Sequence, residues 1–428
     1  MSYKEVLDYL YFQLPMFQRQ GPVAFKKDLK NIRALLRELG NPHKEFKSIH
    51  IAGTNGKGSC SHILASLLAH EGRKIGLYTS PHYKDFRERI KINGNFIPKK
   101  DVIRFVIDNR SLFDEINPSF FEITVVMAFH HFADSDVDYA VIETGLGGRL
   151  DSTNVLDPIL SLITNIGFDH QEFLGNTLPA IAKEKAGIIK RGRQVIIGER
   201  QAEVQGVFEK KAKQKDAPIN YAADVVDLSE YSWNMKGSNF ALRSGREKWN
   251  LKSDLAGSYQ EKNLRAALAA YKLLAKAESM PFEQKKIVSS LRQIRNRTKF
   301  FGRFQVLRQK DPMVLCDSAH NLAGIKNLLD SLDQISRGSL HIVFGTVKDK
   351  DIAPLLELLP KDAQYYFVKA DIPRGMPQHK LQKIAEPFGL NGKSYSSVRR
   401  GFASAIRRAE AKDLVLVCGS IFVVAEVL

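Results

Sequence analysis

The feature that most constrains this chain is the glycine-rich segment 53–59, which reads Gly-Thr-Asn-Gly-Lys-Gly-Ser. An apolar, strand-like run, Ser48–Ile51, precedes it, and a helical pattern, Ser61–Ala69, follows it. A strand, a glycine loop and a helix in this order direct backbone N–H groups and a helix N-terminus at phosphate. Lys57 would add a positive charge for the terminal phosphates, and Ser59 a hydroxyl for Mg²⁺. The segment therefore predicts a nucleoside triphosphate site.

The segment departs from the common G-x-x-x-x-G-K-[ST] pattern. Ile51 stands where the first glycine belongs, and Gly58 separates Lys57 from Ser59. The alternative is a plain glycine-rich turn between a strand and a helix. The Gly-Lys-Gly-Ser order at this place in a βα unit favours phosphate binding.

Composition limits the class of protein. A length of 428 residues is too great for one ordinary core and predicts two or three domains. No run approaches the roughly 20 apolar residues that span a bilayer, and charged residues at positions 4, 5 and 8 argue against a secretory signal. Three widely spaced cysteines indicate free thiols in a reducing compartment. We expect a cytoplasmic protein that does not bind a membrane.

The net charge of +17 is compatible with nucleic acid, a membrane surface or small polyanions as partners. The basic residues are spread along the chain, and no aromatic-basic signature of RNA binding is present. This distribution favours anionic small-molecule substrates over nucleic acid.

Strand-like and helical segments alternate along most of the chain, which predicts an α/β fold with mainly parallel sheets. A helical lead-in covers residues 1–46, a small β meander covers 218–252, and two helices cover Tyr259–Lys276 and Phe282–Arg292. The strands expected before the meander are Ser48–Ile51, Ile75–Tyr78, Tyr139–Ile142, Leu160–Ile163 and Gln194–Ile197. Those expected after the two helices are Met313–Cys316, Leu340–Phe344, Gln364–Val368 and Leu414–Cys418.

The basic stretch 295–299 lacks an apolar period, and we place a domain boundary there. The expected domains are residues 1–297, a P-loop-type ATPase domain with a mainly parallel sheet and the meander, and residues 300–428, a smaller Rossmann-like α/β domain.

Polar residues follow three of the predicted strands directly. Ser80, Glu143 and His170 each come shortly after a strand, and the carboxyl ends of parallel strands share one edge of a sheet. One hydroxyl, one carboxylate and one imidazole do not form a zinc cage, but they suit Mg²⁺ that also binds water and phosphate oxygens. When each of these residues is considered alone, the alternative to a magnesium ligand is a structural role, such as a structural carboxylate or a helix cap at Asp169. The set predicts a magnesium site beside the phosphate loop.

These motifs resemble those of the folylpolyglutamate synthase/dihydrofolate synthase family, which belongs to the Mur ligase superfamily of ATP-dependent amide-forming ligases. The resemblance covers the chain from about the first helix to the C-terminus, and Glu-Thr-Gly-Leu-Gly-Gly-Arg-Leu-Asp at 143–151 is its most specific piece. The matching segments are Ala52–Ser59, Thr79–His82, Glu143–Asn154, Asp169–Gly175, Lys183–Ile188, Asp317–Asn321 and Cys418–Ser420.

The resemblance implies an ATP site shared by both domains, whose closure would exclude water. The residues implied for ATP are Gly56, Lys57, Gly58 and Ser59 as the triphosphate cradle, Asn263 at adenine, and Arg303 and Asp317 at phosphate and ribose.

The resemblance also implies two Mg²⁺ sites. Ser80, Glu143 and His170 match the ligands of one ion. Lys185 matches a lysine that the family carbamylates with CO₂, and the resulting anion would hold the second ion. An ordinary surface lysine is the alternative for Lys185.

The implied substrate residues fall into two groups. The segments that line the pterin pocket correspond to Ser119, Phe121, Glu122, Leu150, Asp151 and Ser152. Phe120 and Phe121 fit a hydrophobic core equally well. His320 and Ser420 match the side of the incoming glutamate, and a plain helix-start residue is the alternative for His320. The expected catalytic residues are Lys57, Lys185 and His320.

Two segments leave questions open. Ser318 stands where the family usually has glycine, which matters if the position requires a positive φ. The loop Met16–Val23 lies where bifunctional members contact dihydropteroate, and its sequence does not decide whether dihydropteroate is a substrate.

The implied reaction is amide ligation. ATP phosphorylates a carboxylate of folate or dihydropteroate, and the α-amine of L-glutamate displaces the phosphate. Within the superfamily, a ligase for peptidoglycan precursors is the alternative. Such ligases usually carry a separate N-terminal UDP-binding domain, and the roughly fifty residues before the phosphate loop disfavour this alternative. Outside the superfamily, a P-loop ATPase acting on nucleic acid and an inactive binding module are the competing interpretations. We expect a monomer, because no unexplained apolar stripe calls for a partner.

Overall fold

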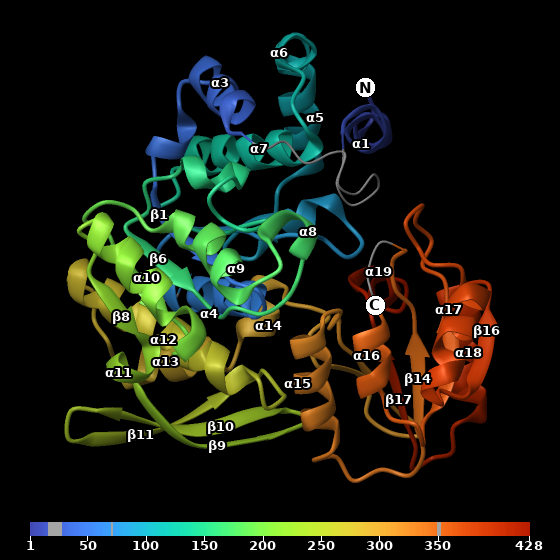
Figure 1. Cartoon of the computed structure of the whole chain (residues 1–428). Helices are drawn as coiled ribbons and strands as arrows, with labels where there is room; N and C mark the ends of the chain where they lie inside the picture. The colour runs from blue at the N-terminus through green and yellow to red at the C-terminus, as the bar shows by residue number, and fades with distance from the viewer. Residues whose placement is uncertain (16–27, 70–71, 349–351) are drawn as a thin grey trace. The chain divides into compact units, whose positions relative to one another are not determined.

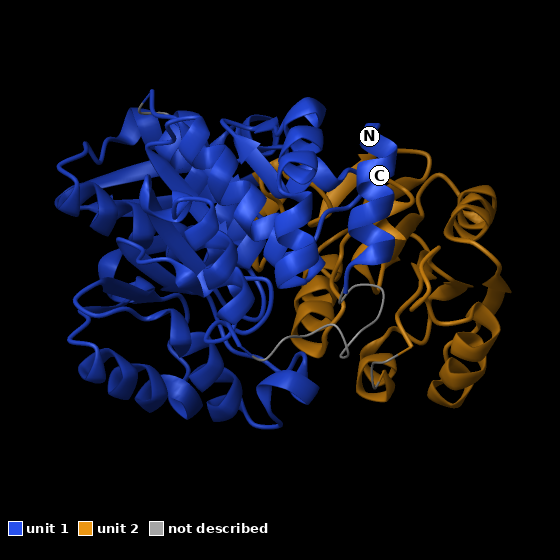
Figure 2. Ribbon diagram, turned by 90° about the horizontal axis from the view of Figure 1, so that it is seen from above, with its two compact units in different colours: residues 1–232, 238–254, 260–299 blue, residues 233–237, 255–259, 300–428 orange. Residues whose placement is uncertain are grey.

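The computed structural model describes residues 1–15, 28–69, 72–348 and 352–428 (Figure 1). The predicted substrate loop 16–23 lies outside the described residues. The chain divides into two compact units (Figure 2). Unit 1 comprises Met1–Ser232, Ser238–Asp254 and Gln260–Lys299, and unit 2 comprises Trp233–Gly237, Leu255–Tyr259 and Phe300–Leu428.

Unit 1 contains an eight-stranded sheet in the order β4-β3-β2-β5-β1-β6-β7-β8. The strands β1, β2 and β5–β8 run parallel, while β3 and β4 form an antiparallel edge. The bounds are β1 Lys47–Ala52, β2 Ile75–Tyr78, β3 Ile90–Ile92, β4 Asn95–Phe96, β5 Tyr139–Glu143, β6 Leu160–Ile163, β7 Gln194–Ile197 and β8 Ile219–Tyr221. The five strands predicted in this region are confirmed.

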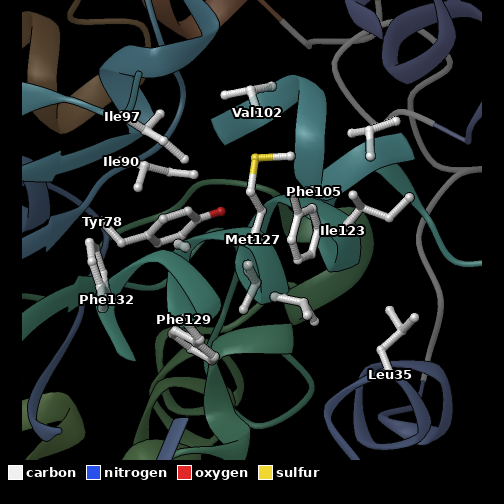
Figure 3. Packing of buried hydrophobic residues seen from close by; sticks show 14 of the residues in the cluster. Leu35, Tyr78, Ile90, Ile97, Val102, Phe105, Ile123, Met127, Phe129 and Phe132 are labelled. Carbon is white, nitrogen blue, oxygen red and sulfur yellow. The ribbon is translucent and has the colours of Figure 1, made fainter. Parts of the chain in front are cut away.

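Helices cover this sheet. On one side α3, α5, α6 and α7 lie together (Figure 1) over a core of aromatic and branched side chains, among them Tyr78, Phe129 and Phe132 (Figure 3). The helices before the meander are α1 Tyr3–Asp8, α3 Lys30–Glu38, α4 Lys57–Ala69, α5 Lys99–Asp108, α6 Arg110–Ile116, α7 Phe120–Asp134, α8 Gln171–Leu174, α9 Leu178–Lys185, α10 Ala202–Gln214 and α11 Ala222–Val225. A short π-helix spans Tyr9–Gln13. Short 3₁₀ helices span Pro42–Lys44, Phe86–Arg89, Ser152–Val155 and Ala186–Ile188.

The region after residue 218 differs in part from its prediction. Residues 219–221 pair with β7 and extend the main sheet instead of joining the meander. The meander itself is a three-stranded sheet, β9 Asp227–Asn234, β10 Gly237–Ser244 and β11 Glu247–Ser253. Three helices follow, α12 Gln260–Ala277, α13 Gln284–Leu291 and α14 Ile294–Thr298. The last was not predicted, because a helix of five residues shows no apolar period.

Unit 2 contains a six-stranded sheet in the order β12-β13-β17-β14-β15-β16, parallel except for β12. Its strands are β12 Gln305–Arg308, β13 Met313–Cys316, β14 Leu340–Phe344, β15 Gln364–Val368, β16 Gly392–Tyr395 and β17 Leu414–Cys418. Its helices are α15 Leu322–Leu332, α16 Ala353–Leu358, α17 Gln378–Ala385, α18 Val398–Arg408 and α19 Ile421–Ala425, with a turn η7 Glu386–Phe388. The predicted α/β class, with a mainly parallel sheet, a meander and a second α/β sheet, is confirmed.

The loop between β1 and α4 depends on two glycines. Gly53 has φ +149°, and an added Cβ would lie 1.8 Å from Thr164 Oγ1. Gly56 has φ +83°, and an added Cβ would lie 2.2 Å from Asn263 Oδ1. Side chains that follow β6 and begin α12 therefore occupy the space beside the loop that a side chain at either glycine would need.

This packing predicts that Gly56→Ala destabilises the fold. The left-handed backbone and the contact with Asn263 should together lower the free energy of unfolding by about 1–3 kcal/mol, measured by urea unfolding. Gly206→Ala is the matched control, since Gly206 lies in α10 with nothing within 4 Å of an added Cβ. The control should be neutral or stabilise by about 0.5–1 kcal/mol. Equal stabilities of the two variants would contradict the close packing at Gly56.

Candidate active site

The predicted phosphate loop is held in place by the segment that follows β6. Thr54 N–H donates to the carbonyl of Asn165 at 2.9 Å, and Asn55 N–H donates to Asn165 Oδ1 at 3.0 Å. The Thr164 hydroxyl donates to the carbonyl of Asn55 at 2.6 Å. The Thr54 hydroxyl also exchanges hydrogen bonds with the main chain of Gly167. Hydrogen bonds from within the protein therefore fix the shape of the loop, and sequence reasoning did not identify these supports.

Lys57, the first residue of α4, reaches back over the loop. Its ammonium donates to the carbonyls of Gly53 at 3.1 Å and Thr54 at 3.2 Å. A lysine in this position can leave the carbonyls for the stronger charge of a phosphate group.

The structure brings Glu143 and Ser80 together beside this loop. Glu143 is the last residue of β5 and is buried, and its Oε2 accepts a hydrogen bond from Ser80 N–H at 3.1 Å. An added Cβ on Gly58 would lie 3.7 Å from the same carboxylate oxygen. The carboxylate thus lies at the start of α4, where Mg²⁺ beside a bound phosphate would need it.

His170 lies after β6, as predicted, immediately before α8. It has a left-handed backbone, with φ 50° and ψ 40°, and its Nε2 is 3.8 Å from Asp169 Oδ2. Among the described residues, no group of three or more His, Cys, Asp or Glu side chains forms a metal cluster.

Lys185 is buried, so the alternative of an ordinary surface lysine is wrong. It ends α9, and its ammonium donates to the carbonyl of Gly53 at 2.8 Å. Burial, aided by the nearby charge of Lys57, lowers the pKa of Lys185 to about 7. A large fraction of this lysine is therefore a neutral amine near neutral pH, which is the form that reacts with CO₂.

Asn263 is buried at the start of α12 beside the loop. Its Nδ2 donates to Gln260 Oε1 at 2.9 Å, which orients its Oδ1 toward Gly56. Cys60 Sγ contacts the Asn263 main chain at 3.6 Å. Asn263, which the resemblance implies as the adenine contact, thus lies next to Gly56 of the predicted phosphate loop.

Ser119 and Glu122 form the capping box of α7. The Ser119 N–H and hydroxyl both donate to Glu122 Oε2, at 2.7 and 2.9 Å, and Glu122 N–H donates to the Ser119 hydroxyl. Phe120 is buried in the core, whereas the half-buried Phe121 presses its ring against Gly145, where an added Cβ would be 2.4 Å away. These residues have structural contacts that account for their presence.

Asp151 lies at the centre of a buried polar chain. Its carboxylate accepts hydrogen bonds from Leu146 N–H at 2.8 Å, from Thr153 N–H at 3.0 Å and from the Thr153 hydroxyl. Thr153 also contacts Nε2 of His50 on β1 at 2.8 Å. Burial raises the pKa of Asp151 and lowers the pKa of His50 to about 3. Neither His50 nor Thr153 was predicted as a site residue, although Thr153 lies within the matching segment Glu143–Asn154. The neighbouring Leu150 and Ser152 are partly exposed.

A second cluster, which the sequence did not reveal, surrounds His82. Arg89 is buried and donates through Nε to His82 Nδ1 at 2.8 Å, and Tyr11 OH lies 3.3 Å from His82 Nε2. The Arg89 guanidinium also lies 5.2 Å from the centre of the Phe120 ring. The cluster joins the Thr79–His82 segment to the start of α7.

Unit 2 arranges its predicted residues around Asp317. Oδ2 of this buried carboxylate accepts from Tyr259 OH at 2.6 Å and Phe304 N–H at 2.7 Å, while Oδ1 accepts from Ala319 N–H at 2.7 Å. Arg303, half-buried, directly precedes Phe304. The departure at Ser318 causes no strain, because its backbone lies outside the positive-φ region and its hydroxyl donates to Gly302 O at 3.0 Å.

The two remaining residues lie at strand ends in unit 2. His320 Nδ1 contacts the Ser318 carbonyl at 2.9 Å, just before α15. Ser420 is buried, and its hydroxyl caps α19 by accepting from Phe422 N–H at 3.2 Å. His320 thus lies at a helix start, the position that the plain structural interpretation expects.

No helix in the described part of the chain has the length and apolar character needed to cross a membrane.

Comparison with known proteins assigns the family. Residues 51–271 match the Mur ligase middle domain, and residues 302–421 match the Mur ligase glutamate ligase domain. The dihydrofolate synthase/folylpolyglutamate synthase of Bacillus subtilis is 30% identical over 413 residues, which are 94% of this chain and 94% of the relative. A probable bifunctional folylpolyglutamate synthase/dihydropteroate synthase of Haloferax volcanii is 33% identical, and the chain spans half of its length.

Solved structures agree with this assignment. The Escherichia coli enzyme in complex with DHPP and ADP has a TM-score of 0.85 and 28% identity, and the match covers 100% of this chain and 97% of that one. Both comparisons agree with the resemblance seen in the sequence, and the chain belongs to the folylpolyglutamate synthase/dihydrofolate synthase family of Mur ligases.

Proposed function

We propose that this protein is an ATP-dependent ligase that joins L-glutamate to a carboxylate of a folate through an acyl phosphate. The substrate carboxylate attacks the γ-phosphorus of ATP, and the bond to the β–γ bridging oxygen breaks to release ADP. The α-amine of glutamate then attacks the carbonyl carbon, loses a proton and displaces phosphate. The observation that carries this proposal is the placement of Lys57, Lys185 and Glu143 around one preshaped phosphate loop.

The nucleotide would be bound by residues of both units. In unit 1 these are Gly56, Lys57, Gly58, Ser59 and Asn263, and in unit 2 they are Arg303 and Asp317. Little acid–base chemistry is required, so positioning and charge neutralisation provide most of the rate acceleration. Lys57 would exchange the loop carbonyls for the γ-phosphate as charge develops there.

The residues beside the loop fit Mg²⁺. The Glu143 carboxylate, Ser80 and His170 would hold one ion, and a carbamylated Lys185 would hold a second. Mg²⁺ bound there would neutralise phosphate charge. Carbamylation needs the neutral amine: Lys185 Nζ attacks the carbon of CO₂, an N–C bond forms, and the nitrogen loses a proton. The lowered pKa of Lys185 and its burial support this assignment.

The acceptor is proposed to be a folate, with dihydropteroate as a second candidate substrate. The residues assigned to its pocket are Ser119, Phe121, Glu122, Leu150, Asp151 and Ser152, and those assigned to glutamate are His320 and Ser420. The capping box at Ser119 and Glu122, and the buried bonds of Asp151, give these three residues the additional role of shaping the pocket. We further propose that residues 1–297 and 300–428 act as the two domains of a cytoplasmic monomer that does not act on nucleic acid.

The competing interpretations are weakened by particular residues. A nucleic-acid motor would need a standard Walker A loop, which Ile51 and Gly58 exclude here. An inactive binding module gives no reason to bury a lysine such as Lys185 against the phosphate loop. A ligase for peptidoglycan precursors would differ mainly in its acceptor, so the choice of acceptor substrate tests it.

The first prediction is coupled turnover. With ATP, Mg²⁺, L-glutamate and tetrahydrofolate, phosphate should be released only when both glutamate and the folate are present. Replacing tetrahydrofolate with dihydropteroate measures the second activity in the same assay.

Lys57→Ala should lower kcat on the order of 10²–10³-fold, as expected for loss of a charge that stabilises the transition state. ATP hydrolysis that requires DNA and does not depend on folate would contradict the proposed ligase function.

The second prediction concerns carbamylation of Lys185. With ¹³C-labelled CO₂, one carbamate should form, detectable by NMR and as added mass in the intact protein. Because the amine has a pKa of about 7, the carbamate should be favoured above that pH and lost as pH falls through it, at constant dissolved CO₂.

The matched controls are two alanine variants of one helix. Lys185→Ala should remove the carbamate signal and turnover together. Lys183→Ala, which changes an exposed lysine of the same helix, should leave both intact. A signal that survives Lys185→Ala would place the modification elsewhere.

A further inference from the structure

The short helix α14 lies at the point where the chain leaves unit 1. Lys299, which caps its C-terminus, has a left-handed backbone with φ 54° and is the last residue of unit 1. Phe300 begins the long segment of unit 2, and Arg303 follows shortly after. The direction of this connection is therefore set by whatever holds Thr298 and Lys299.

Lys91 holds these two residues. Its neighbour Ile90 points into the core (Figure 3), so Lys91 extends from the opposite face of β3. Its side chain is buried, and its ammonium donates to the carbonyls of Thr298 at 3.2 Å and Lys299 at 3.5 Å. The last carbonyls of a helix lack partners in the helix and carry partial negative charge, so a cation there is favourable.

Two further contacts fix the same helix. His62 Nδ1 lies 2.6 Å from the Thr298 hydroxyl, which itself lies 2.6 Å from the carbonyl of Ile294. In the turn between β3 and β4, Gly94 has φ +79°, and an added Cβ would lie 1.8 Å from the Arg297 carbonyl. The hairpin and α4 therefore both press closely on α14.

These holding elements also carry the proposed active site. Lys91 is paired with Leu77 on β2, the strand that leads to Ser80. His62 lies one turn beyond Ser59 on α4. The same helix α14 secures a second connection as well. Arg295 N–H donates to Asp254 Oδ2 at 2.9 Å, and Asp254 is the residue after which the chain crosses to Leu255 of unit 2.

We propose that Lys91 is a positioning residue of the ligase, which sets the course of the chain into unit 2 by holding the last carbonyls of α14. Through this hold Lys91 would fix the end of unit 1 from which the chain continues to Arg303. The inference rests on the proposed function, because it gives Arg303 a role at the phosphates. The proposed role of Lys91 is exerted through α14, because its ammonium donates to carbonyls of that helix end.

The test compares Lys91→Met with Lys74→Met. Lys74 is the matched control, since its ammonium also donates to a helix C-cap carbonyl at 2.8 Å. This lysine is exposed, and the carbonyl belongs to Ser135 after α7 instead of α14. Lys91→Met should lower kcat by about 10- to 100-fold, the cost of a small misplacement of a reacting group, and the Kd for ATP in equilibrium binding should change by a smaller factor than kcat. Lys74→Met should retain the wild-type kcat. Lys91→Arg, which keeps a donor, should recover most of the loss.

A second variant guards against a folding defect. Thr298→Val removes the hydroxyl that His62 contacts with little change in shape, and it should lower kcat in the same direction with Lys91 intact. The inference is overturned if the folded Lys91→Met variant has the kcat of the wild type. It is also overturned if excess Mg²⁺ restores the kcat of this variant, because that result would indicate that Lys91 acts through its charge on Glu143. Failure of the wild-type protein to ligate glutamate would instead reject the proposed function.

Discussion

The site in unit 1 depends on how the loop after β1 is held against the segment after β6. Thr164, Asn165 and Gly167 bond to the loop from one side, and the two glycines leave no room for side chains of their own. Lys57 and Lys185 both donate to the Gly53 carbonyl of the loop held in this way. Because these bonds lie within the protein, they reduce the cost of ordering the loop on binding.

Unit 1 also contains buried basic side chains that hold backbone or ring groups in place. Lys185, Lys91 and Arg89 are each almost fully buried, and burial lowers the pKa of all three. Each donates to a main-chain carbonyl or to a histidine, so each cation fixes a piece of backbone or a ring. A protein that handles anionic substrates can use such groups both as structural ties and as sources of positive potential.

The sequence predicted the features that are local. Apolar runs indicated the bounds of strands such as β2, β6 and β13. The glycine-rich motif located the loop, the ends of predicted strands located Glu143, and the resemblance located Lys185. The sequence did not predict β3, β4 or α14, because these short elements contain polar residues and show neither a continuous apolar run nor a helical period. Contacts between distant segments were also inaccessible: nothing near Thr164 indicates that it supports the loop, and nothing near Lys185 indicates that it is buried.

The central claim is that phosphate from ATP is transferred to the acceptor carboxylate before glutamate attacks. The most direct test uses a folate whose reacting carboxylate is labelled with ¹⁸O, followed by mass analysis of the phosphate released. An acyl phosphate joins carbon to phosphorus through a carboxylate oxygen, and attack at carbon leaves that oxygen on the phosphate. The account predicts one labelled oxygen in each phosphate produced by turnover. Unlabelled phosphate would show that water or another group had cleaved ATP and would contradict the mechanism.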